Sequence, residues 1–136
     1  MKYRMRWEND FRSYVCGLDQ KKSVIICGDM NCAHTEKDVK NDKSNTRSTG
    51  FTQEEQKNMT EINFSVFTDY FRYFDPDKTD AYAWWSLTPG VRERNVGWRI
   101  DYFLDSSRLT DRVTSTPLYF DIYGSDHCSV GLEVEI

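Results

Sequence analysis

The sequence lacks a long apolar run, an N-terminal signal peptide, internal repeats and cysteine pairs at zinc-finger spacing. No apolar stretch approaches the roughly 18 residues that a membrane-spanning helix requires. The N-terminal segment, residues 1–7, contains neither an apolar core nor a small-residue cleavage site. These absences exclude a membrane span or membrane partner and indicate an intracellular protein.

The four cysteines show no C-x-x-C spacing, and the sequence contains only two histidines, His34 and His127. A structural zinc site needs four such ligands in a compact repeat, so the pattern argues against one. Disulfides are not expected without a secretory signal. We therefore expect reduced thiols that are mostly buried and behave as small hydrophobic side chains.

The charge is moderately acidic and unevenly distributed. The 136 residues contain 18 Lys and Arg against 22 Asp and Glu, for a net charge of −4. This balance argues against nonspecific coating of nucleic acid, but it permits a local phosphate-binding face and suits a divalent-metal site. Aromatic residues make up 15 % of the chain, too many for a disordered acidic segment, and the length fits one domain.

The hydrophobic pattern predicts an α/β fold, α+β in some schemes. An amphipathic helix is expected over 4–20, with an apolar stripe of Trp7, Phe11, Tyr14, Val15 and Leu18. A capping box at 52–55 opens a second helix that extends to about Phe64. Between them lie a buried strand at 24–27 and a long polar loop at 31–50. Further strands are expected at 82–86, 98–104, 118–122 and 129–136, which together predict one mixed sheet with helices on one face.

Three short polar segments carry candidate chemistry. Gly28-Asp29-Met30-Asn31 follows the apolar strand, where open α/β sheets place ligands. Gly124-Ser125-Asp126-His127 offers a carboxylate for a metal ion and an imidazole for a phosphate. Asp101 lies on an aromatic strand and would need a partner if buried, for which a histidine is suited. Each segment alone also fits a turn or a surface strand, but together they indicate metal-assisted phosphodiester hydrolysis.

Basic and aromatic residues indicate a face for nucleic acid. Lys40, Lys43 and Arg47 on the long loop could hold flanking phosphates. The tryptophans Trp84, Trp85 and Trp98 could form a pocket for a sugar or a displaced base, although any single Trp is more typical of a core.

Six stretches together resemble one known family. They are VIICGDMNCAH from Val24, the loop from Asp38 through GFT, FRYFDPD from Phe71, AYAWWS, RNVGWRIDYFL from Arg94 and GSDHC from Gly124. In this order they resemble the C-terminal half of the exonuclease III-type apurinic/apyrimidinic endonucleases, in the exonuclease–endonuclease–phosphatase superfamily. The resemblance covers nearly the whole chain and predicts half of the four-layer α/β sandwich of the deoxyribonuclease I-like fold.

The resemblance implies a role for each matching residue. Asp29 would orient or deprotonate the attacking water, and Asn31 would help to hold the scissile phosphate. Asp126 would contribute to a Mg²⁺ site, with Mn²⁺ as an alternative ion. His127, supported by Asp101, would bind the phosphate and stabilise the transition state. The residues implied in DNA contact are Asn41, Lys43, Asn45, Arg47, Trp84, Trp85 and Trp98.

The implied activity is DNA repair, by cleavage of double-stranded DNA 5′ to abasic sites, with 3′→5′ exonuclease activity as an addition. The implied location is the nucleus or the bacterial cytoplasm. The family's N-terminal half supplies further Asn, Glu and Tyr site residues that have no counterpart here. Residues 1–136 are therefore expected to be a partial domain whose exposed sheet face takes an N-terminal half or self-associates. A noncatalytic DNA-binding or complementing module is the alternative, and a lipid phosphatase is disfavoured by the NVGWRIDYF stretch.

Overall fold

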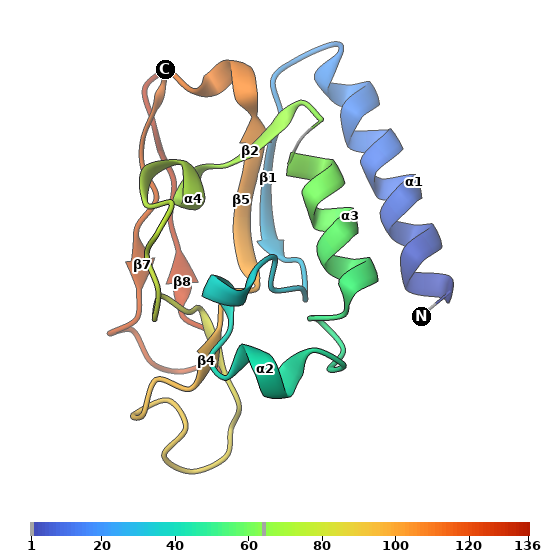
Figure 1. Cartoon of the computed structure of the whole chain (residues 1–136). Coiled ribbons are helices and arrows are strands. Elements are labelled where there is room, and N and C mark those ends of the chain that lie inside the picture. The colour runs from blue at the N-terminus through green and yellow to red at the C-terminus, as the bar shows by residue number, and fades with distance from the viewer. Residues whose placement is uncertain (1, 64) are drawn as a thin grey trace.

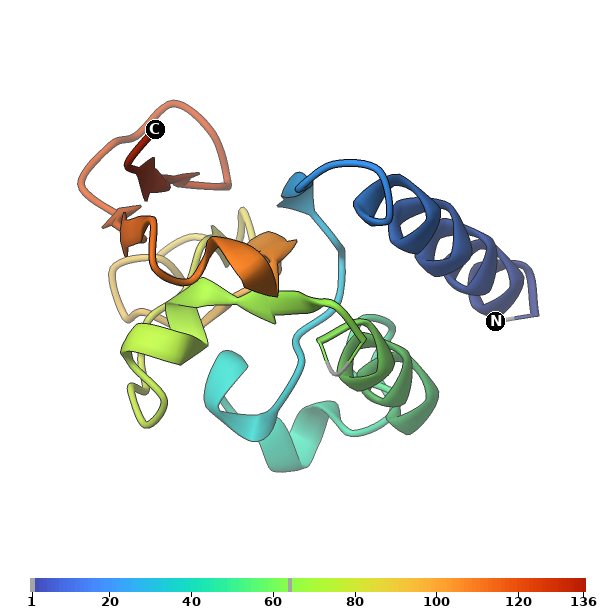
Figure 2. The same cartoon turned by 90° about the horizontal axis from the view of Figure 1, so that it is seen from above.

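Two helices cover one face of a small central sheet (Figure 1). The computed structural model describes residues 2–63 and 65–136. The helices are α1 (Lys2–Asp19) and α3 (Gln53–Asn63), and the sheet has the order β1-β5-β2, with β1 (Ile25–Asp29), β5 (Asp101–Ser106) and β2 (Phe67–Asp69). Seen from above, the helices lie on one side of β1 and β5 and the C-terminal strands on the other (Figure 2).

The other strands form three two-stranded sheets. They pair β3 (Trp84–Trp85) with β4 (Gly97–Trp98), β6 (Val113–Ser115) with β9 (Glu133–Val134), and β7 (Leu118–Tyr119) with β8 (Ser129–Val130). Short helical segments connect the strands, and these are η1 (Glu36–Asp38), α2 (Asp42–Asn45), α4 (Tyr70–Phe74) and η2 (Ser107–Leu109).

The expected α/β class is confirmed, but the single mixed sheet is wrong. Every described strand pair is antiparallel, and the strands fall into four sheets. The run predicted at 98–104 is divided because the Arg99 N–H donates to the Asp38 carbonyl (2.7 Å) outside the ladder. The run at 129–136 is divided because its first part, β8, pairs with β7 whereas its second part, β9, pairs with β6. The strand at 118–122 shortens to two residues, and β2 and α4 were not predicted.

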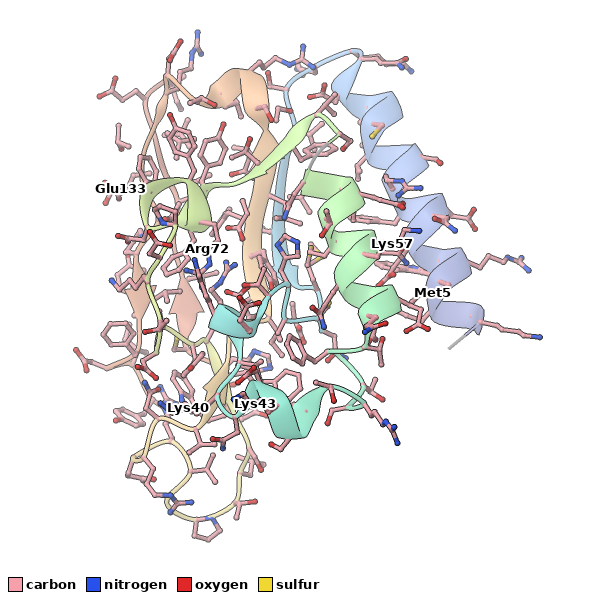
Figure 3. All side chains as sticks on the ribbon, viewed as in Figure 1. Met5, Lys40, Lys43, Lys57, Arg72 and Glu133 are labelled. Carbon is pink, nitrogen blue, oxygen red and sulfur yellow. The ribbon has the colours of Figure 1, made fainter. Side chains whose placement is uncertain are left out.

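Helix α1 forms as predicted, but only part of the predicted stripe faces the core: Val15 is buried and Phe11 packs against it. Glu8, Val15 and Asp19 are its buried residues, whereas Trp7, Tyr14 and Leu18 from the predicted stripe are exposed. Polar partners make this burial possible, because Asn58 on α3 donates to Glu8 and Ser106 at the end of β5 donates to Asp19. Met5 and Lys57 lie between the two helices in Figure 3.

The first core packs α1 and α3 against β1, β2 and β5. Its buried members are Val15, Ile26, Cys32, Met59, Ile62, Phe67, Tyr102 and Leu104. The predicted capping box is confirmed at the start of α3, where the Thr52 N–H donates to the Glu55 carboxylate (3.2 Å) and the Glu55 N–H donates to the Thr52 hydroxyl (3.4 Å). Met1 and the predicted end of this helix at Phe64 lie outside the described residues.

The four thiols are free, but the prediction that they are mostly buried is correct for only two of them. Cys32 and Cys128 are buried, Cys16 is half-buried and Cys27 is exposed. Cys27 is exposed because it lies on the outward face of β1 opposite Phe103. Within the described part of the chain, no helix is long and apolar enough to cross a membrane.

A buried ionic cluster fixes the long loop to the central sheet. The Arg99 side chain is 1 % exposed and donates to Asp38 (2.7 Å) and, with two nitrogens, to Asp69 (2.6 and 3.2 Å). Its guanidinium also lies between the rings of Phe71 and Tyr102. Arg72 adds a second cation to Asp38 at 2.7 Å. The predicted loop at 31–50 is thus an ordered segment containing η1 and α2.

Candidate active site

The end of β1 presents Asp29 and Asn31. Gly28 and Asn31 have positive φ angles of 136° and 50°, so the chain turns sharply where the strand stops. The Asn31 N–H donates to Asp29 Oδ1 (2.6 Å) and closes the turn on the carboxylate. This local bond positions Asp29, whose side chain is exposed at the edge of the sheet.

Asp101 lies directly opposite Asp29 in the β1–β5 register and contacts a histidine. Its Oδ2 lies 2.8 Å from His127 Nδ1. Burial raises the pKa of Asp101, the His127 hydrogen bond lowers it, and nearby Asp29 and Asp126 raise it, with a net upward shift. The pair has the geometry in which a carboxylate fixes the orientation of an imidazole and stabilises its protonated form.

Asp126 and His127 are held against β3. The Trp85 N–H donates to the Asp126 carbonyl (3.0 Å), and the Cys128 N–H donates to the Ala83 carbonyl (2.7 Å). The Trp84 indole donates to Asp126 Oδ2 (3.0 Å). That hydrogen bond lowers the pKa of the half-buried Asp126 carboxyl and keeps it ionised.

Asp29, Asn31, Trp84 and His127 contribute to the lining of one cavity of about 330 Å³. It is lined by Asp29, Asn31, Ser48, Thr49, Trp84, Trp98, Ile100 and His127. Trp84 and Trp98 are cross-strand partners whose rings meet edge to face, with centroids 6.4 Å apart. The cavity therefore has a polar end, formed by the Asp29 carboxylate and the His127 imidazole, and an aromatic wall formed by the two tryptophans. This combination suits an anionic ligand that carries a ring.

Sequence reasoning brought most of this site together but missed three lining residues. Ser48, Thr49 and Ile100 line the cavity and were not predicted to. Ser48 and Thr49 lie in the long loop without a chemical motif of their own. Ile100 had a usable signal, because it alternates with Trp98 on the same predicted strand.

The predicted DNA-contacting residues of the loop lie on and beside α2. Asn41, Lys43 and Arg47 are exposed, whereas Asn45 is half-buried and donates to the carbonyls of Lys40 and Asn41. Lys43 lies at α2, near Lys40, at the end of the molecule that also carries the β3–β4 connection (Figure 3). Lys40 itself pairs with Asp80 at 2.7 Å.

Trp85 does not reach the cavity, so the prediction that it contacts DNA is wrong. The side chain is 3 % exposed and packs in a core with Tyr82, Ala83 and Cys128. Its indole donates to Asn95 Oδ1 (3.0 Å). The physical reason is that neighbouring residues of a strand face opposite sides, so only one of Trp84 and Trp85 can face the cavity.

The residues present fit part of a divalent-metal site. Asp126 offers hard carboxylate oxygens, and Mg²⁺ in proteins often uses one or two carboxylates together with water and substrate phosphate. Among residues 2–63 and 65–136, no group of three or more His, Cys, Asp and Glu side chains is placed to hold a metal ion.

Comparison with known proteins places this geometry among nucleases. Residues 2–127 match the model of the "Endonuclease/Exonuclease/phosphatase family". The chain is 47 % identical over 134 residues to an exodeoxyribonuclease of Bacillus subtilis, covering 98 % of this chain and 53 % of the relative. It is 45 % identical over 130 residues to the DNA repair nuclease APEX1 of Danio rerio, covering 96 % and 42 %.

Solved structures agree with the fold. The AP endonuclease LMAP of Leishmania major superposes with a TM-score of 0.89 at 30 % identity, over 96 % of this chain and 43 % of that one. A 3′ phosphatase from Neisseria, NExo, has a TM-score of 0.91 at 19 % identity, over 99 % and 54 %. The expected fold is confirmed, and the chain spans about half the length of the curated relatives named above.

Proposed function

Because the chain belongs to the endonuclease/exonuclease/phosphatase family, we propose that it carries half of the active site of a DNA repair nuclease. The proposed reaction is hydrolysis of a phosphodiester 5′ to an abasic site in double-stranded DNA, with 3′→5′ exonuclease activity as an addition. The corresponding location is the compartment that holds the DNA, the nucleus or the bacterial cytoplasm. The names of the relatives support a DNA substrate, and the acidic, imidazole and aromatic lining of the cavity supports phosphodiester hydrolysis.

The observation that carries the proposal is the contact between His127 and Asp101 beside the cavity that Asp29 and Asn31 also line. An imidazolium whose Nδ1–H donates to a carboxylate presents its Nε2–H as a second donor, and a donor that meets developing negative charge lowers the barrier. In this proposal His127 binds the scissile phosphate and stabilises the transition state.

Asp29 is proposed to hold the attacking water. One of its oxygens accepts the Asn31 N–H, and among the described residues the other has no protein donor. It can therefore accept a proton from a water in the cavity. The Asn31 side chain, at the same turn, is proposed to steady the phosphate, while Trp84 and Trp98 line the space for the abasic sugar.

The proposed cofactor is Mg²⁺, with Mn²⁺ as an alternative, because the family comprises metal-dependent nucleases. When bound, the ion supplies charge neutralisation at the phosphate. Asp126 would hold it through the oxygens that Trp84 and Ser125 orient. The remaining ligands are proposed to come from a second segment or a second chain that packs on the sheet face bearing Ile25, Cys27 and Phe103.

A cleavage assay with a duplex containing one abasic-site analogue tests the proposal. The chain is measured with Mg²⁺, alone and mixed with the portion of the Bacillus subtilis relative that it does not match. We expect incision in the mixture that requires Mg²⁺, and we expect His127→Asn to reduce it roughly 10²- to 10⁴-fold while the duplex stays bound. Asp111→Asn, exposed and outside both the cavity and that sheet face, is the matched control and should cleave normally.

The second candidate, a noncatalytic DNA-binding or complementing module, is favoured by the incomplete set of metal ligands among the described residues. It predicts that the same duplex binds equally to the chain and to its His127→Asn variant and that no mixture cleaves it. Absence of both binding and cleavage would contradict both candidates.

A further inference from the structure

One arginine connects the β3–β4 connection, residues 86–96, to the turn at residues 120–125. The Arg92 guanidinium donates to the carbonyls of Phe120 (3.0 Å), Ile122 (2.9 Å) and Ser125 (3.0 Å). The same group lies over two rings, 4.2 Å from the Tyr123 centroid and 4.5 Å from that of Trp85. A single side chain thus holds three main-chain acceptors of one turn.

Side-chain packing contributes little to this turn. Phe120, Ile122 and Tyr123 are 48, 55 and 73 % exposed, so their apolar surface is not buried in a core. The turn's own main-chain bond is from Ile122 N–H to the Tyr119 carbonyl (3.1 Å). Gly124 follows with a positive φ of 122°, a conformation that permits a sharp bend but does not stabilise it.

The turn leads directly into the reacting groups. Ser125 accepts the His127 N–H through its hydroxyl (3.1 Å), and the hydroxyl donates to Asp126 Oδ1 (3.3 Å). The carbonyl of the same Ser125 accepts from Arg92. On the other side the Arg92 guanidinium lies over the ring of Trp85, which is buried in a core cluster with Tyr82, Ala83 and Cys128.

We propose that Arg92 is a positioning residue that connects the turn at 120–125 to the Trp85 core and so sets the location of Asp126 and His127. A guanidinium is suited to this because it is planar, presents five donors in fixed directions and stacks on aromatic faces, whereas a lysine ammonium has none of these properties. The expected effect of Arg92 on the cleavage rate rests on the proposed function, but its expected effect on the conformation of the turn does not.

The structural experiment compares Arg92→Lys with Arg94→Lys in the full chain. Arg94 is the matched control, because it lies in the same connection, is exposed, and has no side-chain hydrogen bond to the described residues. We expect Arg92→Lys to shift or broaden the amide NMR signals of residues 120–127 and to speed their hydrogen exchange about tenfold. The signals of β1 and β5, and the urea midpoint, should stay unchanged, and Arg94→Lys should change none of these.

Chemical rescue separates the missing guanidinium from general damage. Guanidinium at millimolar concentration should restore the amide signals of residues 120–127 in Arg92→Ala but not alter them in Arg94→Ala. In the reconstituted cleavage assay, Arg92→Lys should lower kcat roughly 10- to 100-fold, the effect of a reacting group displaced by about 1 Å, with KM nearly unchanged.

Three results would each overturn the proposal. The amide signals of residues 120–127 could stay unchanged in Arg92→Lys, they could change equally in Arg94→Lys, or Arg92→Lys could lose the whole fold. Failure of the proposed function has a different signature. In that case no mixture cleaves DNA, while the turn still responds to Arg92→Lys and to guanidinium.

Discussion

At the residue scale, Arg99 shows how a single side chain can order a loop. It is buried between two rings and satisfies Asp38 and Asp69 together, while its own N–H binds the Asp38 carbonyl. Burial alone would raise the pKa of Asp38, but the guanidinium groups of Arg99 and Arg72 lower it to about 2. Asp38 therefore stabilises the fold above about pH 4, and this contribution is lost as the pH falls toward 2.

Replacing Arg99 by Met should destabilise the chain by about 3–5 kcal/mol, because buried Asp69 loses its cation and buried Asp38 keeps only Arg72. Urea unfolding at pH 7 measures this. The control is Lys40→Met on the same loop, which removes an ion pair of equal length, 2.7 Å, in an exposed position. Exposed pairs contribute little, so the control should unfold close to the wild type, and an equal loss in both variants would contradict the role of burial.

At the element scale, the β3–β4 pair forms the aromatic wall of the cavity and leaves no spare room. Gly97 on β4 opposes Trp85, and a Cβ added there would lie 2.5 Å from Trp85 Nε1 and 2.7 Å from the Tyr82 Cβ. The close approach brings Trp84 and Trp98 opposite each other. A glycine in this strand is thus required by packing, which periodicity alone does not reveal.

Gly97→Ala should lower the free energy of unfolding by about 1–3 kcal/mol through overpacking, as measured by urea denaturation. Gly17→Ala in α1 is a control with the opposite expectation, because nothing lies within 4 Å of its Cβ position and alanine favours a helix by roughly 0.5–1 kcal/mol. A Gly97→Ala variant as stable as the wild type would show that β3 and β4 can separate without cost.

At the scale of the whole molecule, Asp105 makes stability depend on pH. Its side chain is fully buried on β5, Oδ1 accepts the Ile26 N–H (3.0 Å), and Oδ2 has no partner among the described residues. Burial raises the pKa of Asp105 to about 7, the Ile26 bond lowers it slightly, and Asp69 raises it. Between about pH 4 and 7 the folded state therefore binds more protons than the unfolded state, so this residue's contribution to stability falls as the pH rises.

Asp105→Asn should remove this dependence. We expect the stability of the variant relative to the wild type to rise by roughly 3 kcal/mol between pH 5 and pH 8, because the wild type loses about 1.4 kcal/mol per pH unit up to about pH 7, where Asp105 is ionised only in the unfolded state. Urea midpoints at the two pH values measure the difference, and exposed Asp121→Asn is the control. A difference between Asp105→Asn and wild type that does not grow with pH would contradict the assignment.

The sequence was sufficient for what depends on local pattern. Helix α1, the capped start of α3 and the strand before Asp29 follow from periodicity and capping chemistry, and the family follows from motifs around Asp29, Asp101 and His127. The roles of those residues stay predictions. Local signals could not reveal the division of the 98–104 strand, since its cause is a hydrogen bond from Arg99 to Asp38, 61 residues away.

Tertiary structure alone decided which members of each pattern reach the site. Trp84 lines the cavity and Trp85 a core, because a strand alternates its faces and only strand pairing decides which face meets the ligand. Glu8 and Asp19 are buried on α1 because Asn58 and Ser106 lie in reach. Sequence determined the chemical groups available to this protein, while long-range contacts, whose partners no local window contains, determined which of them meet.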